Sequence, residues 1–235
     1  MFNITYNQNM CVILTDNPAV AVQENENGRA VIGVYGRTAP IDRFTGIMYL
    51  TDTFLVGKNL LALSYARKKN EPMVVAKSDR LLVRETCLSD IPAFYEIYED
   101  EEICKYMEGL HRDPDEEEAY LKKYIEEVYP FYNYGMWTLI YKETGEIIGR
   151  AGLEPKGDKA ELGYLISKKF RGMGLGTEAV NLVLEYAEEM QPSEEICARV
   201  RSENEVSVHI LEAFFFEKEK EENGLIYYKL PKNRN

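Results

Sequence analysis

The sequence lacks the features of a membrane protein and of a secreted protein. It contains no apolar run of 18 or more residues, so no membrane-spanning helix is expected. Residues 1–5 contain neither a basic segment nor a long apolar one, so no secretory signal is predicted. The four cysteines are scattered without a Cys-x-x-Cys pair, which argues against a disulfide scaffold and against a structural zinc site. We therefore expect a soluble, cytoplasmic protein without a bound metal.

Basic residues are scarce in the second part of the chain. Residues 1–80 contain 9 Lys and Arg against 7 Asp and Glu, whereas residues 81–235 contain 19 against 33. The formal charge of -12 therefore comes from the second part. An acidic surface repels phosphates, so we expect no nucleic-acid partner. Such a surface suits a cationic partner, although it is equally consistent with solubility alone.

The composition supports a folded chain with two parts. Hydrophobic residues make up 45% of the 235 residues, which is enough for a sizeable core. The length exceeds that of one ordinary domain but falls short of two full ones. We place a boundary near residue 78, with a small α/β unit over residues 1–78 and a larger domain over residues 79–235.

Strands and helices alternate in the small unit, which indicates a mostly parallel sheet. We expect strands over 11–14, 30–36 and 46–50 and helices over 19–27 and 58–69. The order of strand, aspartate, helix and strand ending in Val31-Ile32-Gly33-Val34 weakly resembles part of the haloacid-dehalogenase-type phosphatases. Their nucleophilic Asp-x-Asp pattern is absent from residues 1–78, so Asp16 is expected to cap a helix.

The larger domain begins with a strand and continues with two helices and a strand hairpin. We expect a helix that starts at Ser89 as its cap and a second helix over 115–129 that Pro130 ends. The sequence Lys142-Glu143-Thr144-Gly145-Glu146 is typical of a hairpin turn. The expected strands cover residues 81–85, 136–141, 147–153 and 160–166.

A glycine-rich segment follows the last of these strands and opens a long helix. It reads Arg171-Gly172-Met173-Gly174-Leu175-Gly176-Thr177. Glycines permit close backbone approach, and the free amides of a helix N-terminus favour phosphate or pyrophosphate. The pattern is neither a Walker A loop nor a dinucleotide fingerprint. Taken alone, the three glycines could also make only a tight turn between strand and helix.

This segment and its neighbours resemble the GNAT superfamily of acetyl-CoA-dependent N-acetyltransferases over residues 79–235. The branch with the ribosomal-protein N-terminal acetyltransferases is the most similar. The resemblance implies an α/β (α+β) fold with a mixed, mostly antiparallel sheet flanked by helices. It rests on Leu81-Leu82-Val83-Arg84-Glu85 with Asp90, on Glu161-Leu162-Gly163-Tyr164 through Thr177-Glu178-Ala179, and on Arg201-Ser202-Glu203-Asn204-Glu205-Val206-Ser207.

The resemblance also implies how acetyl-CoA would be held. Its pyrophosphate would lie on the amides of Arg171 through Thr177. Its pantetheine arm would pair with Leu165, Ile166 and Ser167 at the end of the preceding strand. Asn204 and, as a weaker candidate, Ser207 would contact the pantetheine side. Helix capping is the alternative role for both, because Ser202-x-x-Glu205 has the form of a capping box.

The chemistry implied is transfer of an acetyl group from a thioester to a neutral amine. A base must take a proton, and Glu161 is the candidate because it aligns with a glutamate often found on this strand. A backbone amide near Ile166 would stabilise the oxyanion. A structural ion pair is the alternative role for Glu161. Tyr134 is a candidate for the acceptor site.

Two positions depart from the family pattern. Leu211 occupies the place of a tyrosine that protonates the leaving thiolate in many relatives. Ala213-Phe214-Phe215-Phe216 replaces the usual Lys-x-Gly-Phe, which puts the local turn in doubt. Because the proton donor is missing, a non-catalytic acyl-CoA-binding sensor or interaction protein is the alternative to an enzyme.

The acceptor side is expected to be acidic. The stretch from Glu99 to Glu118, which lies in the first two helices and their loop, would wall the acceptor pocket in this family. Acids there would attract a cationic small molecule, such as a polyamine or an aminoglycoside, or a basic peptide N-terminus. They equally fit a solvated helix face with favourable charges at a helix start. We expect a monomer or a homodimer.

Overall fold

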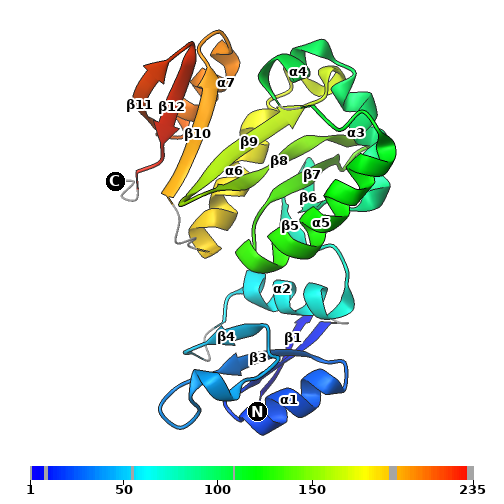
Figure 1. Cartoon of the computed structure of the whole chain (residues 1–235), viewed down its shortest axis with the longest axis vertical. Helices are drawn as coiled ribbons and strands as arrows, with labels where there is room; N and C mark the ends of the chain where they lie inside the picture. The colour runs from blue at the N-terminus through cyan, green and yellow to red at the C-terminus, as the bar shows by residue number, and fades with distance from the viewer. Residues whose placement is uncertain (1, 8–9, 54–55, 108, 191–194, 232–235) are drawn as a thin grey trace. The chain divides into compact units, whose positions relative to one another are not determined.

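The computed structural model describes residues 2–7, 10–53, 56–107, 109–190 and 195–231. The chain forms two compact units, one over Met1–Met73 and the other over Val74–Asn235 (Figure 1). The division falls before residue 78 because Val74–Lys77 forms strand β5, which pairs with strand β6 of the larger unit.

The smaller unit is a four-stranded sheet in the order β1-β2-β3-β4, with two helices. Strands β2, β3 and β4 run parallel, as the alternating pattern predicts, and the unpredicted β1 lies antiparallel to β2. Asn17, and not Asp16, caps the first helix, because its side-chain oxygen accepts from the amide of Ala19 at 3.0 Å. The elements are β1 Phe2–Asn7, β2 Met10–Thr15, α1 Pro18–Glu26, β3 Ala30–Val34, β4 Tyr49–Thr51 and α2 Lys58–Lys69.

The larger unit contains an eight-stranded sheet in the order β11-β12-β10-β9-β8-β7-β6-β5. All neighbouring strands are antiparallel except β9 and β10, which run parallel. The prediction of a mixed, mostly antiparallel sheet is confirmed. The strands are β5 Val74–Lys77, β6 Leu81–Glu85, β7 Met136–Tyr141, β8 Ile147–Lys156, β9 Lys159–Ile166, β10 Glu195–Arg201, β11 Glu217–Glu222 and β12 Leu225–Lys229.

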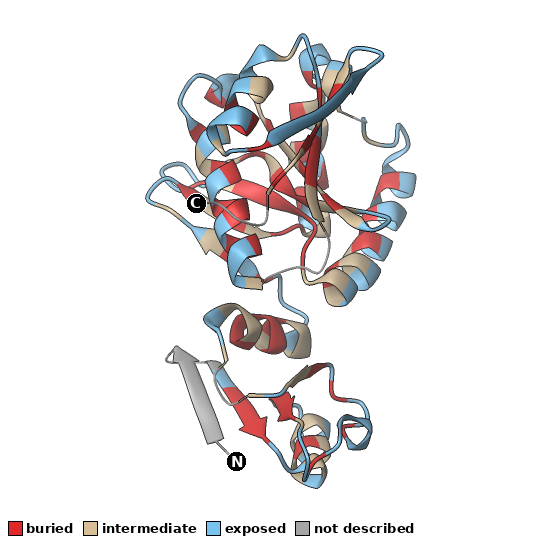
Figure 2. Cartoon of the chain, turned by 90° about the vertical axis from the view of Figure 1, so that its left-hand side faces the viewer, coloured by how far each residue is buried: buried red, intermediate tan, exposed pale blue. Residues whose placement is uncertain are grey.

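Helices cover both faces of this sheet, and its central strands are buried (Figure 2). On one face, Leu165 of β9 packs with Phe94, Ile97 and Ile103. On the other, Trp137 of β7 meets the ring of Tyr186 edge-on. The helices are α3 Ile91–Tyr98, α4 Glu101–Tyr106, α5 Pro114–Tyr132, α6 Leu175–Met190 and α7 Glu205–Ala213.

Two expected helix ends are wrong. Helix α5 continues past Pro130 to Tyr132, because a proline near the last turn removes only its own amide hydrogen bond. The helix ends where Asn133 adopts a left-handed conformation. Ser89 is not a cap, since it lies inside the short 3₁₀ turn Leu88–Asp90. The Asp90 carboxylate accepts from the Cys87 amide there at 3.0 Å.

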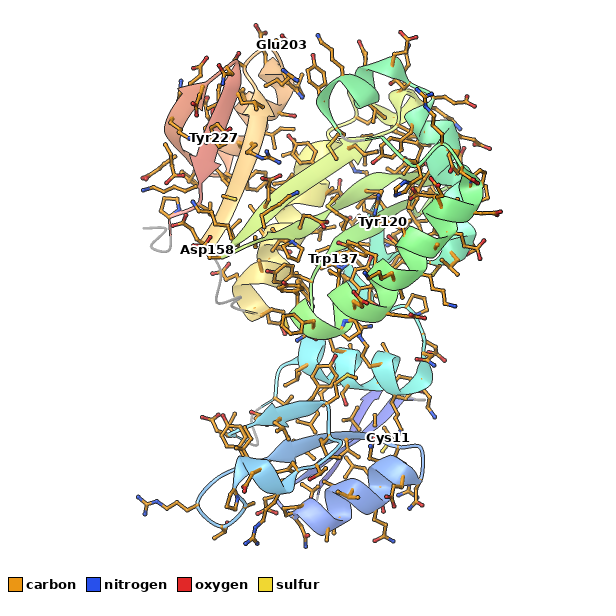
Figure 3. The ribbon with its side chains drawn as sticks, in the orientation of Figure 1. Cys11, Tyr120, Trp137, Asp158, Glu203 and Tyr227 are labelled. Atoms are coloured by element: carbon orange, nitrogen blue, oxygen red, sulfur yellow. The ribbon has the colours of Figure 1, made fainter. Side chains whose placement is uncertain are left out.

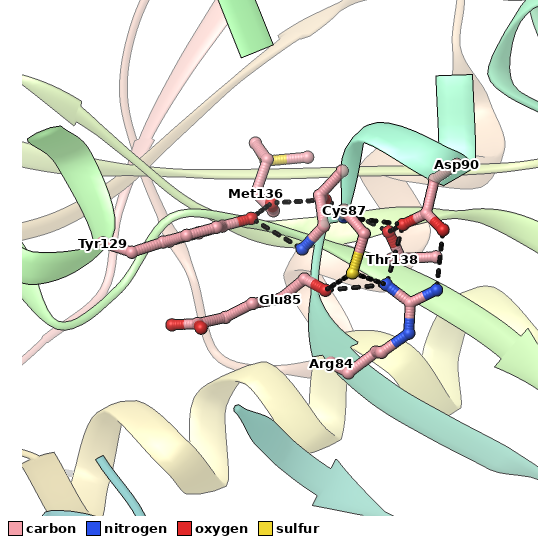
Figure 4. A network of polar contacts seen from close by, with 8 residues as sticks. Arg84, Glu85, Cys87, Asp90, Tyr129, Met136 and Thr138 are labelled. Atoms are coloured by element: carbon pink, nitrogen blue, oxygen red, sulfur yellow. Dashed lines mark hydrogen bonds and ion pairs between the residues drawn. The ribbon is translucent and has the colours of Figure 1, made fainter. Parts of the chain in front are cut away.

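A buried ion pair joins the start of α3 to the sheet (Figure 4). The Arg84 guanidinium donates to both carboxylate oxygens of Asp90, each at 2.7 Å. Thr138 of β7 donates to the same carboxylate at 2.8 Å. The Tyr129 hydroxyl of α5 accepts from the Thr86 amide at 3.1 Å. Helices α3 and α5 are thereby fixed to strands β6 and β7.

We predict that Asp90→Asn lowers the free energy of unfolding by about 3 kcal/mol near neutral pH, because it leaves Arg84 without its buried partner. Burial alone would raise the pKa of Asp90, but hydrogen bonds from Arg84, Cys87 and Thr138 lower it. The contribution is therefore complete above the ordinary carboxyl pKa and is lost as the pH falls through the lowered one. Urea unfolding of both proteins from pH 7 to pH 3 checks this. A difference in unfolding free energy between the two proteins that stays constant with pH would contradict this prediction.

The turn after α7 holds a bulky residue in a left-handed conformation. Phe215 has φ 62°, and it occupies the position of the glycine in the related Lys-x-Gly-Phe pattern. The amide of Phe216 donates to the carbonyl of Leu211 at 3.0 Å, which is the six-to-one bond of a Schellman motif. Phe216 is buried while Phe215 is 72% exposed. The turn therefore forms without glycine, at the expense of backbone strain.

We predict that Phe215→Gly is more stable than Phe215→Ala by about 1 kcal/mol, since both remove the exposed ring and only glycine relieves the strain. The melting temperature of the glycine variant should be about 2–4 °C higher, as measured by calorimetry. Equal melting temperatures would show that the turn is not strained.

Candidate active site

Strands β9 and β10 separate after a short parallel contact. Residues 159–161 of β9 pair with residues 195–197 of β10, and the recorded pairing ends there. Residues 162–166 of β9 remain paired with β8 on the other side. One edge of β9 is thus turned toward the gap between the two strands. The predicted pantetheine-binding residues Leu165 and Ile166 lie at the end of this edge.

The predicted loop leads from β9 into helix α6. Gly172 and Gly174 have φ of 77° and 75°, a region that other residues adopt only with strain. Helix α6 begins at Leu175, so Leu175, Gly176 and Thr177 form its first turn. Amides of a first turn have no acceptor within the helix. Together with the helix dipole they form a site suited to a phosphate.

Arg171 does not point freely at an incoming anion. Its side chain donates to the carbonyl of Ile166 at 3.1 Å, to Asp100 at 2.6 Å and to Glu102 at 2.5 Å. It therefore links the end of β9 to the start of α4. The positive character of the loop comes mainly from its amides.

Arg80 is a loop contact that the sequence analysis did not identify. Its guanidinium donates to the carbonyl of Met173 at 2.8 Å and to Glu178 of α6 at 2.8 Å. Ser78 also donates to Glu178. The turn between β5 and β6 thus supports the outside of the loop. Nothing local in the sequence indicates a contact over this separation in the chain.

A pair of glycines lies on the sheet face that α3 covers. Gly152 of β8 and Gly163 of β9 face each other across the strands. A Cβ on Gly152 would lie 2.0 Å from the carbonyl oxygen of Gly135, so no side chain fits there. Glu154 and Glu161 form the next pair along the same two strands. Two carboxylates therefore lie side by side next to this glycine pair, over which the Gly135 backbone and the Met136 side chain pack.

The two carboxylates have different partners. Glu161 accepts from Arg199 of β10 through both oxygens, at 2.6 and 3.1 Å. Glu154 accepts from the Tyr124 hydroxyl of α5 at 2.9 Å. Burial raises the pKa of Glu154, and the hydrogen bond from Tyr124 reduces that rise. Sequence reasoning missed Glu154, because its environment comes from α5.

A hollow of about 260 Å³ lies beside Glu161. Arg199 and Cys197 of β10 line it together with Tyr227 of β12. Figure 3 labels Tyr227 on that strand. Burial raises the pKa of the Cys197 thiol to about 11, so the thiol is neutral near pH 7. The hollow therefore lies next to the predicted base.

The other predicted residues lie in and just before α7 and in the segment before β7. Asn204, and not Ser202, caps α7, and its side-chain oxygen accepts from the Ser207 amide at 3.2 Å. Leu211 is 3% exposed within α7. Tyr134 is also buried, at 4% exposed, and its ring packs against Tyr132. A substrate could reach Tyr134 only if its surroundings moved.

Acids of the expected acidic wall have local structural partners. Asp100 caps α4 and Asp113 caps α5. Glu117 is buried and accepts from the His111 amide at 2.9 Å. Glu101, Glu116 and Glu118 are exposed. Part of the stretch therefore stabilises helix ends, and part stays available to a cationic partner.

Comparison with known proteins identifies the class to which this fold and site belong. Residues 80–217 match the family model described as an acetyltransferase (GNAT) domain. This match spans more than half of the chain, and the chain belongs to the GNAT acetyltransferase family. The family prediction is confirmed, and acetyltransferases of this family use acetyl-CoA.

Individual relatives agree with this assignment. The uncharacterized N-acetyltransferase p20 of Bacillus licheniformis is 28% identical over 145 residues, which cover 60% of this chain and 82% of that protein. A GNAT acetyltransferase structure from Bacillus anthracis has a TM-score of 0.56 at 22% identity, covering 67% of this chain and 98% of that one. RimL, a ribosomal L7/L12 alpha-N-protein acetyltransferase, has a TM-score of 0.57 at 16% identity, covering 68% and 94%. At these identities the two structures show a shared fold.

We predict that Gly172→Ala weakens CoA binding by about fivefold, because a Cβ strains the left-handed backbone by ~1 kcal/mol and shifts the loop amides. Gly157→Ala is the matched control, since Gly157 has φ 66° in the turn between β8 and β9 and, like Gly172, has open space around a Cβ. Calorimetric titration with CoA measures both. Equal affinities of the two variants would mean that the loop does not hold CoA.

Proposed function

We propose that this chain transfers an acetyl group from acetyl-CoA to a primary amine, by direct attack in a ternary complex. The observation that carries the proposal is the separation of β9 from β10 between a phosphate-type loop and the paired carboxylates of Glu154 and Glu161. A ligand with a pyrophosphate and an extended arm fits one side of this gap. An amine fits the other side, beside Glu154 and Glu161.

The chain's own residues supply binding and proton transfer. The loop amides from Arg171 to Thr177 hold the pyrophosphate, and Leu165 to Ser167 align the pantetheine arm, with Asn204 on its other side. The amide near Ile166 stabilises the oxyanion that forms at the thioester carbonyl. Glu161 takes the proton of the attacking amine. Its ion pair with Arg199 keeps the carboxylate in a fixed orientation.

The acceptor class we propose is a cationic small molecule or a peptide N-terminus. Exposed acids at the starts of α4 and α5 support a cationic acceptor, because they attract positive charge. The structural likeness to RimL, an alpha-N-protein acetyltransferase, supports a peptide N-terminus. A thiol-release assay with acetyl-CoA and polyamines, aminoglycosides, amino acids and peptides separates these classes.

We infer a cytoplasmic enzyme that acts as a monomer or a homodimer. None of the helices in the described ranges combines the length and the apolar character that crossing a bilayer requires. The scattered cysteines support a reducing compartment. Sedimentation would establish the oligomeric state.

A second candidate function is a non-catalytic sensor that binds acyl-CoA. The specific observation in its favour is Leu211. This buried side chain has no acidic proton, and it occupies the expected place of the tyrosine that protonates the leaving thiolate. CoA binding without thiol release from any acceptor would favour the sensor. Absence of CoA binding would contradict both functions.

We predict that Glu161→Gln lowers kcat about 10²-fold, because the amide cannot take the amine's proton, and that the affinity for CoA is unchanged. Glu195→Gln is the matched control, because Glu195 of β10 is also ion-paired, to Lys159 at 2.9 Å. Steady-state kinetics with the best acceptor measure both. Full activity of Glu161→Gln would remove Glu161 from the mechanism.

Glu154→Gln distinguishes the second carboxylate in the same assay. If Glu154 were the base, its variant would lose the activity instead, and the acid limb of kcat/KM in the unmodified protein would lie above the ordinary glutamate range, because burial raises the pKa of Glu154. With Glu161 as the base, Glu154→Gln affects mainly KM for the amine.

A further inference from the structure

A buried hydroxyl group lies at the gap between β9 and β10. Tyr164 belongs to β9, past the last residue that pairs with β10. Its hydroxyl oxygen is buried, and no well-formed hydrogen bond reaches it within the described ranges. A buried hydroxyl that is poorly hydrogen-bonded costs free energy, and such groups often await a ligand or serve catalysis.

The ring of Tyr164 lies on the side of the sheet where the loop helix begins. A Cβ placed on Gly176, in the first turn of α6, would lie 3.8 Å from Cε2 of Tyr164. The same position would lie 3.8 Å from Cγ1 of Ile166 and from Cδ1 of Ile210 in α7. Tyr164 is therefore next to the first turn of α6, next to α7 and next to the end of β9.

The polar neighbour of this hydroxyl is Ser207, in the first turn of α7. Burial raises the pKa of Tyr164, and the Ser207 hydroxyl reduces that rise. The phenol is therefore protonated at neutral pH. One helical turn further along α7, Leu211 has no proton to give.

We propose that Tyr164 donates the proton that the sulfur of CoA receives as the thioester bond breaks. This inference rests on the proposed acetyl transfer. Tyr164 lies on the same strand as the predicted base Glu161, but alternation along the strand directs the two side chains to opposite faces. The base Glu161 and the acid Tyr164 therefore lie on opposite faces of the sheet. Both faces open to the gap between β9 and β10, where the thioester would lie.

In this step the acetyl group moves from the sulfur of CoA to the nitrogen of the amine. The amine nitrogen bonds to the thioester carbon, and Glu161 accepts one proton from that nitrogen. The carbon–sulfur bond then breaks with its electron pair on sulfur. The phenolic proton of Tyr164 moves to the sulfur and gives a neutral thiol. Water returns a proton to the phenolate, with Ser207 as the adjacent relay. A thiolate in a buried gap is a stronger base than in water, which favours the transfer.

The first test is Tyr164→Phe, which removes only the hydroxyl oxygen. We expect kcat to fall roughly 10- to 100-fold with little change in KM for acetyl-CoA. Because the hydroxyl makes no well-formed hydrogen bond within the described ranges and has only its contact with Ser207 to lose, the melting temperature should fall little. Tyr228→Phe is the matched control, since Tyr228 is also a strand tyrosine of this sheet, in β12, and its hydroxyl donates to Glu212 at 3.3 Å. The control should keep its kcat.

The second test measures binding without turnover. Calorimetry compares CoA with desulfo-CoA, in which hydrogen replaces the thiol. The unmodified protein and Tyr228→Phe should bind CoA about fivefold more tightly than desulfo-CoA, and Tyr164→Phe should lose this preference. Loss of kcat with the preference intact would indicate a structural role and overturn the proposal.

The outcomes separate this inference from the proposed function. Thiol release by the unmodified protein, with kcat and the CoA preference of Tyr164→Phe both unchanged, would overturn the role of Tyr164 and leave acetyl transfer standing. No thiol release with any acceptor would overturn acetyl transfer, and the proton step with it, even if Tyr164 still controls the preference for CoA.

Discussion

The larger unit depends on a parallel strand contact that covers residues 159–161 and 195–197. Parallel neighbours cannot be joined by a tight turn, so the chain must cross over, and α6 is the crossover helix. This places the N-terminus of α6 at the carboxyl end of β9, where open α/β sheets usually bind ligands. If the contact continued along both strands, the edge of β9 would be occupied. The site therefore follows from the early end of the pairing.

A chain of hydrogen bonds connects the stability of the unit to this site. The backbone amide of Met136 donates to the Tyr124 hydroxyl at 2.9 Å, and the Met136 carbonyl accepts from the Tyr129 hydroxyl at 2.5 Å. Tyr124 continues to Glu154, while Tyr129 leads through Thr86 toward the buried Asp90 pair. A change that loosens the start of α3 is therefore expected to affect the position of the Glu154 carboxylate, which lies next to the Gly152–Gly163 pair.

The sequence predicts the parts of this protein that depend on neighbouring residues. Helical spacing and three glycines identify α6 and its loop, and the strand alternation that places Glu161 beside Leu165 is local too. The sequence does not predict the contact of Arg80 with the loop carbonyl of Met173, nor the burial of Glu154 under α5. Both contacts join segments that are far apart in the chain. Phe215 is an intermediate case. The lost glycine marks the turn, but only the structure shows that the backbone keeps a left-handed conformation without it.

The charges around the loop explain how a chain with a formal charge of -12 can hold a polyanion. Arg171 is paired with Asp100 and Glu102, and Arg80 is paired with Glu178. Net charge near the loop is therefore small. In the proposed site we therefore expect the attraction for a phosphate to come from directed amides and the dipole of α6, which act within about one helical turn. An anion is thus favoured only where it can accept those hydrogen bonds, and other polyanions gain nothing from the surface around it.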